Sequence, residues 1–172
     1  RCQDDEVCVC EMSQADAGQV MKILEIAEKD PAGWRKTTLQ ERHKIMYEAA
    51  NRLGEMRGDL IGCMCAVTGK TVVEGDVEVS EGIDYARFYT TSMKQFAELP
   101  GVDIAPKGTI LVISPWNFPC AIPIGGIVAG LAGGNTVILK PATVAAPVAW
   151  LFAKAFWDAG VPKEALQVII TD

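Results

Sequence analysis

Three short apolar runs rich in valine and isoleucine constrain the fold of this chain most strongly, and they lie at 109–113, 136–139 and 166–170. Each run is too short for a helix, whereas the segments between them, 119–131 and 147–159, carry apolar residues at helical spacing. Pro147 suits the first turn of the second segment and Gly160 suits its end. Strands that alternate with helices form parallel sheets, so the sequence predicts an α/β fold with a βαβαβ unit.

Capping signals and apolar spacing predict four helices in the residues before this unit. Ser13 and Asp16 resemble a capping box at the start of the first helix, which Pro31 ends. Thr38 and Glu41 form the stronger T-x-x-E start signal of the second helix. Two more helical runs follow, at 57–68, closed by a glycine, and at 71–96.

The helix at 71–96 is expected to be amphipathic, with acidic residues facing solvent and an apolar stripe formed by Val72, Val79, Ile83 and Ala86. Tyr85, Phe88 and Tyr89 are interpreted as core residues, with a pocket lining as the alternative. His43 is the only histidine and therefore a candidate for a catalytic role, but no sequence motif pairs it with a Ser, Cys or Asp. We therefore expect His43 to be structural or on the surface.

The domain organisation predicted from these elements has three parts. Residues 1–98 form a helical part, and residues 99–108, with two prolines and two glycines, form a connector or a small hairpin. Residues 109–172 form the βαβαβ half of a parallel sheet. The short Val/Ile stretch inside 99–108 is compatible with either a plain connector or an oligomerisation segment.

Composition indicates a globular protein that acts on small molecules. The 172 residues are 49% hydrophobic and 22% charged, which is enough apolar material for a substantial core. A net charge of −6 without a compensating basic cluster disfavours nucleic acid and anionic membranes as partners. No segment resembles a signal peptide, so we expect a cytoplasmic protein.

One uncharged stretch of twenty residues, from Cys120 to Leu139, raises the alternative of a membrane span. Its five glycines favour instead a short helix, a turn and a buried strand packed in a sheet. We therefore expect no membrane span.

The cysteines raise the alternative of a metal site, and they are Cys2, Cys8, Cys10, Cys63, Cys65 and Cys120. Four of them form two C-x-C pairs, a spacing shorter than the C-x₂-C of zinc sites. We therefore expect reduced, packed cysteines and no bound metal.

Polar residues follow the first two predicted strands at the point where each strand ends. Asn117 lies in the turn Ser114-Pro115-Trp116-Asn117-Phe118-Pro119, and Lys140 ends the second strand. Ligands of open α/β sheets bind outside the carboxyl ends of the strands. A carboxamide is a fixed neutral donor suited to an oxyanion, and a lysine suits a ribose or phosphate. The alternatives are an ordinary turn asparagine and a lysine at the solvent boundary.

The usual phosphate-binding G-x-G-x-x-G does not follow the first strand, so an ordinary Rossmann phosphate clamp is not indicated. The Gly-rich run 130–135 lies between a helix and a strand and is interpreted as a turn.

These motifs resemble those of the aldehyde dehydrogenase superfamily: Ile113-Ser114-Pro115-Trp116-Asn117-Phe118-Pro119 and Gly134-Asn135-Thr136-Val137-Ile138-Leu139-Lys140-Pro141. The likeness extends from about Ala15 to the end of the chain. It implies a Rossmann-like domain that binds NAD, or alternatively NADP, and an aldehyde that is oxidised through a cysteine thiohemiacetal.

The resemblance also implies a role for each residue of the two motifs. Asn117 becomes the side chain of the oxyanion hole, Lys140 binds the adenosine ribose, and Phe118 faces the substrate tunnel. Ser114, Pro115 and Trp116 lie along the cofactor. The family usually has a glutamate three residues after the lysine, where this chain has Thr143, and this departure weakens a strict preference for NAD.

Within the superfamily, three segments together look most like pyrroline-5-carboxylate dehydrogenases: Lys140-Pro141-Ala142, Thr68-Gly69-Lys70-Thr71 and the tyrosine-bearing segment 83–89. Many of these enzymes form the C-terminal half of bifunctional proline utilisation A. Glutamate γ-semialdehyde is then the substrate, and FAD is implied only if a proline dehydrogenase domain precedes this segment.

The catalytic Cys and the general-base Glu of the family lie beyond residue 172. We therefore expect an inactive N-terminal fragment of an enzyme that forms homo-oligomers. The alternatives are a non-catalytic nucleotide-binding or assembly module and another aldehyde dehydrogenase, such as a succinate-semialdehyde type.

Overall fold

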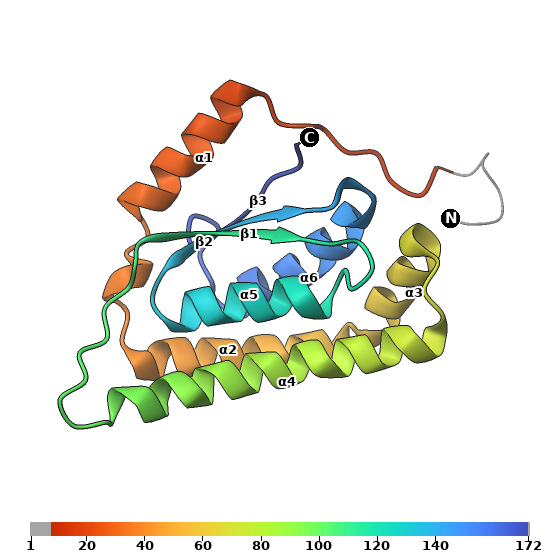
Figure 1. The fold of residues 1–172 in the computed structure, drawn as a ribbon. Helices are drawn as coiled ribbons and strands as arrows, with labels where there is room; N and C mark the ends of the chain where they lie inside the picture. Colours follow the sequence, from red (N-terminus) through yellow and green to blue (C-terminus); the bar gives the residue numbers. More distant parts are fainter. Residues whose placement is uncertain (1–7, 172) are drawn as a thin grey trace.

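A three-stranded parallel sheet with helices on both faces organises the molecule, which a computed structural model describes for residues 8–171 (Figure 1). The strands stand in the order β1 (Thr109–Ser114), β2 (Thr136–Pro141) and β3 (Leu166–Val168), and both neighbouring pairs are parallel. The predicted α/β fold with a βαβαβ unit is confirmed. β3 ends two residues earlier than expected, and the backbone carbonyl of Ile170 accepts a hydrogen bond from the Ala15 amide instead (2.7 Å).

The helices form layers on the two faces of this sheet (Figure 1). One face carries α5 (Ala121–Ala132) and α6 (Ala146–Asp158), and the other carries α1 (Ala17–Lys29). Below α5 lies a further layer made of two long helices, α2 (Leu39–Glu55) and α4 (Val72–Ala97). α3 (Arg57–Thr68) packs against α4 and α6, and two short 3₁₀ helices precede α2 and α6, η1 (Trp34–Lys36) and η2 (Thr143–Ala145).

The helix starts follow local capping chemistry. At α2 the Thr38 hydroxyl accepts from the Glu41 amide (3.2 Å), and the Glu41 carboxylate accepts from the Thr38 amide (2.7 Å), as predicted. The capping box predicted for α1 at Ser13 and Asp16 is wrong. Asp16 is the N-cap itself: its carboxylate accepts from the Gln19 amide (2.7 Å), and the side-chain oxygen of Gln19 accepts from the Asp16 amide (2.9 Å). The residue three positions after Ser13 is Asp16, whose carboxylate is engaged with Gln19 instead.

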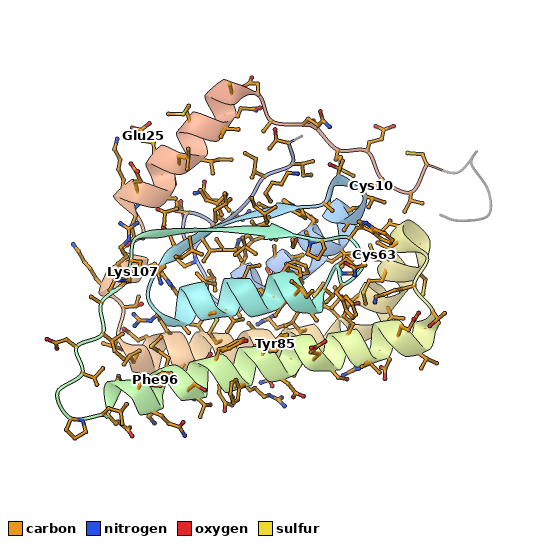
Figure 2. The ribbon with its side chains drawn as sticks, in the orientation of Figure 1. Cys10, Glu25, Cys63, Tyr85, Phe96 and Lys107 are labelled. Atoms are coloured by element: carbon orange, nitrogen blue, oxygen red, sulfur yellow. The ribbon has the colours of Figure 1, made fainter. Side chains whose placement is uncertain are left out.

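Glycines in α5 let this helix lie close to the sheet. A methyl group added at Gly130 would stand 2.7 Å from Cγ2 of Val137, and one at Gly126 would stand 3.0 Å from Cγ1 of Val112. Tyr85 of α4 lies against the opposite side of the same helix, where a methyl at Gly125 would stand 3.1 Å from its ring (Figure 2). The predicted short helix with glycines packed on a parallel sheet is therefore present.

Buried side chains of η1 and α2 donate hydrogen bonds to the end of α5. The Trp34 indole donates to the carbonyl of Leu131 (3.2 Å), and the Arg42 guanidinium donates to that of Ala132 (3.0 Å). Both carbonyls belong to the last turn of α5, whose carbonyls have no partner within the helix. These bonds therefore complete the end of α5 from outside the helix.

The opposite face of the sheet is only partly covered. Ile138 and Ile169 pack with Ala27 of α1, whereas Leu111 and Ile113 of β1 remain 57% and 69% exposed. All of these side chains lie on one face because side chains alternate along a strand. This arrangement leaves an apolar strip beside α1.

Several expectations for α4 and its surroundings need correction. Phe88 is 64% exposed rather than core, while Tyr85 and Tyr89 are half-buried and stack with ring centroids 5.5 Å apart. Val72 is exposed because it stands at the first turn, beyond the helices that cover the rest of its stripe. The acidic face is not wholly solvated, since Glu78 is buried.

Residues 99–108, all within the described part of the chain, contain neither helix nor strand and connect α4 with β1 (Figure 1). The hairpin considered as an alternative is therefore not formed by these residues. Across the described residues, no helix combines the length and the apolar character needed to cross a membrane.

Candidate active site

The carboxyl ends of β1 and β2 lie side by side, which brings both sequence motifs to one edge of the sheet. Ile113 pairs with Lys140 and Ser114 pairs with Pro141, and the Ser114 carbonyl then accepts from the Ala142 amide (3.1 Å). Because side chains alternate along a strand, Lys140 lies on the α1 face and Ser114 lies on the α5 face. The edge therefore offers polar groups on both sides of the sheet.

The turn after β1 presents its side chains to solvent. Pro115, Trp116, Asn117 and Phe118 are all exposed, whereas Ser114 is buried at the strand end. The carboxamide of Asn117 makes no hydrogen bond to any residue that the structure describes. Its N–H donors are therefore available to a ligand.

Lys140 stands at the rim of an apolar cavity of about 310 Å³ between α1 and the sheet. The remaining walls are apolar except for one threonine, and they comprise Val20, Ile23, Leu24, Leu111, Ile113, Ile138, Ile169 and Thr171. Thr143 begins η2 three residues beyond Lys140 and is exposed. A cation beside an apolar wall at a strand end suits a ligand that has both polar and flat apolar parts.

Glu78 of α4 holds the far end of the turn, a role that the sequence prediction missed. Its Oε1 accepts from the backbone amides of Cys120 (2.7 Å) and Ala121 (3.1 Å), at the start of α5. Helix N-termini carry unsatisfied N–H groups and a partial positive charge, so a carboxylate there is stabilising. Glu78 therefore caps α5 from a different helix.

Lys70 completes this buried cluster. Its Nζ lies 2.8 Å from Oε2 of Glu78 and 4.3 Å from the centroid of the Phe118 ring. An ammonium above an aromatic face is attracted by the ring quadrupole. One lysine thus links the buried carboxylate to an exposed residue of the turn.

The stripe of small and apolar residues along α4 could have identified Glu78 as a buried residue from the sequence. The small or apolar residues that α4 buries are Gly75, Val79, Gly82, Ile83 and Ala86, and Glu78 lies within that stripe. A single acid in a buried stripe indicates a partnered carboxylate, because an unpaired buried charge is costly.

Cys120 stands at the N-cap position of α5 with no exposed surface. Burial, and next the negative charge of Glu78, raise the pKa of the Cys120 thiol far above its ordinary value. Because the thiolate is the reactive form, this cysteine is not an activated nucleophile.

Within residues 8–171, the cysteines and the histidine do not lie together in a metal-binding group. Among residues 8–171 there is no group of three or more His, Cys, Asp or Glu side chains placed to hold a metal ion. Cys8 and Cys10 are exposed, Cys63 and Cys65 are half-buried, and Cys2 lies outside the described residues. His43 is half-buried and stacks on Tyr47, with ring centroids 4.4 Å apart.

The fold and the strand ends together define a class of protein. A parallel α/β sheet with polar residues beyond the carboxyl ends of adjacent strands is the Rossmann-like half of a cofactor domain. The chain matches the model of the Aldehyde dehydrogenase family over residues 2–172 and belongs to that family. The resemblance drawn from its two motifs is confirmed.

Two individual relatives within this family are similar to the chain over most of its length. The chain is 33% identical over 170 residues to a 1-pyrroline-5-carboxylate dehydrogenase of Geobacillus sp. (strain WCH70), an alignment covering 92% of this chain and 33% of that protein. It is 31% identical over 168 residues to an alpha-ketoglutaric semialdehyde dehydrogenase of Bacillus subtilis (strain 168), covering 92% and 34%.

Among solved structures, proline utilization A from Corynebacterium freiburgense superposes with a TM-score of 0.88 at 36% identity, over 95% of this chain and 17% of that chain. The present chain thus spans about a third of the length of the curated relatives that it matches.

Proposed function

We propose that this chain is the amino-terminal part of an NAD(P)-dependent aldehyde dehydrogenase that oxidises glutamate γ-semialdehyde to glutamate. Family membership and the names of the relatives, several of them 1-pyrroline-5-carboxylate dehydrogenases, support the proposal. The similarity to proline utilization A supports the same substrate and a place in proline catabolism. We expect a cytoplasmic homo-oligomer, with FAD involved only where a proline dehydrogenase domain precedes this segment.

The observation that carries the proposal is the exposed Asn117 carboxamide, which has no partner among the described residues. When a cysteine thiolate adds to the aldehyde carbon, the carbonyl electron pair moves onto oxygen, and Asn117 donates a hydrogen bond to that oxygen. A fixed neutral donor aimed at developing charge lowers the barrier without first having to lose a proton. By the family resemblance the thiolate comes from beyond residue 172.

The residues at the strand ends fit a dinucleotide. Lys140 offers donors for the ribose hydroxyls, and the apolar cavity of about 310 Å³ at its side suits a flat heterocycle. Ser114, Pro115 and Trp116 lie along the bound molecule, and Phe118 faces the aldehyde. NAD(P), when bound, accepts the hydride from the substrate carbon. Thr143 in place of a glutamate removes a repulsion against a 2′-phosphate, so we expect NADP to be accepted as well.

The test is a steady-state assay of the full-length protein that contains this chain, with glutamate γ-semialdehyde and with either NAD or NADP. We expect oxidation that Asn117→Ala lowers at least about 100-fold in kcat, as removal of one oxyanion donor does. Alpha-ketoglutaric semialdehyde and succinate semialdehyde serve as competing substrates. Cofactor binding by calorimetry without oxidation of any aldehyde would instead support a nucleotide-binding module.

A further inference from the structure

The turn that carries Asn117 is fixed to the scaffold at both ends. At its start the Ser114 carbonyl accepts from the Ala142 amide, so the first end is part of the sheet. At its far end, Glu78 accepts from the amides of Cys120 and Ala121. Between these anchors the exposed Phe118 ring lies against the Lys70 ammonium, whose Nζ is 4.3 Å from the ring centroid.

The second anchor reaches the turn from a distant part of the chain. Glu78 is 42 residues before Cys120 and 43 before Ala121, and it comes from α4, which lies in a different layer from the sheet. α4 therefore sets the place where α5 begins relative to the end of β1. A shift of α4 that breaks these two bonds releases the turn at one end.

Burial makes this anchor costly unless all its parts are present. Glu78 is 2% exposed, and only Lys70 faces it with a positive charge among the described residues. A buried carboxylate is tolerated when hydrogen bonds and an opposite charge replace water. Stability alone is a weak explanation for such a pair, since an apolar pair of similar volume is often as stable.

We propose that Glu78 and Lys70 are positioning residues for the active site, which hold the Asn117 carboxamide where the oxyanion forms. Glu78 accepts the hydrogen bonds that fix the backbone after Asn117. Lys70 balances the charge of Glu78 and holds the Phe118 ring through the cation–π contact. The proposal rests on the proposed function, in which Asn117 donates to the oxyanion.

Three variants of the full-length protein separate placement from charge. Glu78→Ala removes the acceptor, and Lys70→Met leaves the carboxylate buried without its cation. The double variant Glu78→Gln with Lys70→Met keeps an amide oxygen for the two backbone N–H groups and removes both charges. Asp84→Asn, at an exposed carboxylate of the same helix, is the control.

The first measurement is kcat and KM with glutamate γ-semialdehyde, at a temperature where circular dichroism shows each variant folded. We expect Glu78→Ala to lower kcat about 10- to 100-fold, because a displacement near 1 Å at a reacting group has that effect. KM stays within about threefold, since the donor acts mainly in the transition state. The double variant restores kcat to within about threefold, and Asp84→Asn has no effect.

The second measurement is amide hydrogen exchange at Cys120 and Ala121, which needs no activity. Exchange is expected to quicken at least about tenfold in Glu78→Ala and to return to the wild-type rate in the double variant. Faster exchange with kcat within twofold of the wild type overturns the positioning role, as does a double variant as slow as Glu78→Ala. Wild-type protein that oxidises no aldehyde refutes the proposed function instead, while the exchange rates still decide whether Glu78 holds the turn.

Discussion

The close approach of α5 to the sheet predicts that one glycine-to-alanine substitution destabilises the chain while another stabilises it. In Gly130→Ala the new methyl stands 2.7 Å from Cγ2 of Val137, a buried β-branched residue that cannot rotate its methyl away without leaving its rotamer. Overpacking of this kind costs about 1–3 kcal/mol, against about 1 kcal/mol gained from the better helix propensity of alanine. We expect a net loss of up to about 2 kcal/mol.

Gly62→Ala is the matched control, because it makes the same substitution in α3 at a site with no neighbouring atom within 4 Å. There the propensity gain is unopposed, and we expect about 0.5–1 kcal/mol of stabilisation. Thermal and urea unfolding followed by circular dichroism measure both variants, and each kcal/mol shifts Tm by about 2–4 °C in a chain of this size.

The reasoning also predicts coupling between Gly130 and Val137. When Val137→Ala is combined with Gly130→Ala, the clash is absent, so the double variant loses less stability than the two single losses added together. Two glycine variants with equal unfolding free energies, or strictly additive losses in the double variant, would refute the packing argument.

Three further outcomes are expected from the structure. Folding raises the pKa of the Cys120 thiol, so this thiol contributes its full stabilisation below the pKa of the unfolded thiol, near 8.5. The stabilisation falls as the pH rises above that value. In alkaline unfolding experiments we therefore expect the wild type to lose stability relative to Cys120→Ala. Asp30→Ala removes the acceptor of the Trp34 and Arg35 amides (both 2.9 Å) and should cost about 1–3 kcal/mol in urea unfolding. Ile113→Thr on the exposed strip beside α1 should reduce self-association of the 172-residue chain in light scattering, whereas an unchanged scattering profile would exclude this strip as the cause.

The elements that the sequence predicted are those whose signals lie within a few residues. Thr38 and Glu41 are three residues apart, and the glycine after α3 has a left-handed φ of 71°, so local chemistry alone marks both helix ends. The same holds for the strand ends, where the polar residues come directly after apolar runs. Local spacing misplaced the cap of α1 because Ser13 and Asp16 both carry side chains that can cap a helix. Only Asp16 is followed three residues later by a glutamine, Gln19.

The part of the candidate site that the sequence did not predict depends on contacts between distant residues. The two backbone amides that Glu78 binds lie more than forty residues away, and nothing beside Glu78 in the sequence identifies them. The exposure of Phe88 likewise depends on which helices pack on α4, which periodicity alone does not specify. Asn117 was identified from its motif, whereas its anchor required the fold.

The position of α1 has a consequence for how the chain folds. Among the helices of residues 8–171, α1 is synthesised before the others, but the residues that it covers on the sheet, Ile138 and Ile169, come more than a hundred residues later. Gln167 and Ile170 near the carboxyl end also bond to the α1 segment. Contacts of such high sequence separation form slowly, so we expect α2, α3 and α4 to associate first and α1 to dock last, once β3 has left the ribosome.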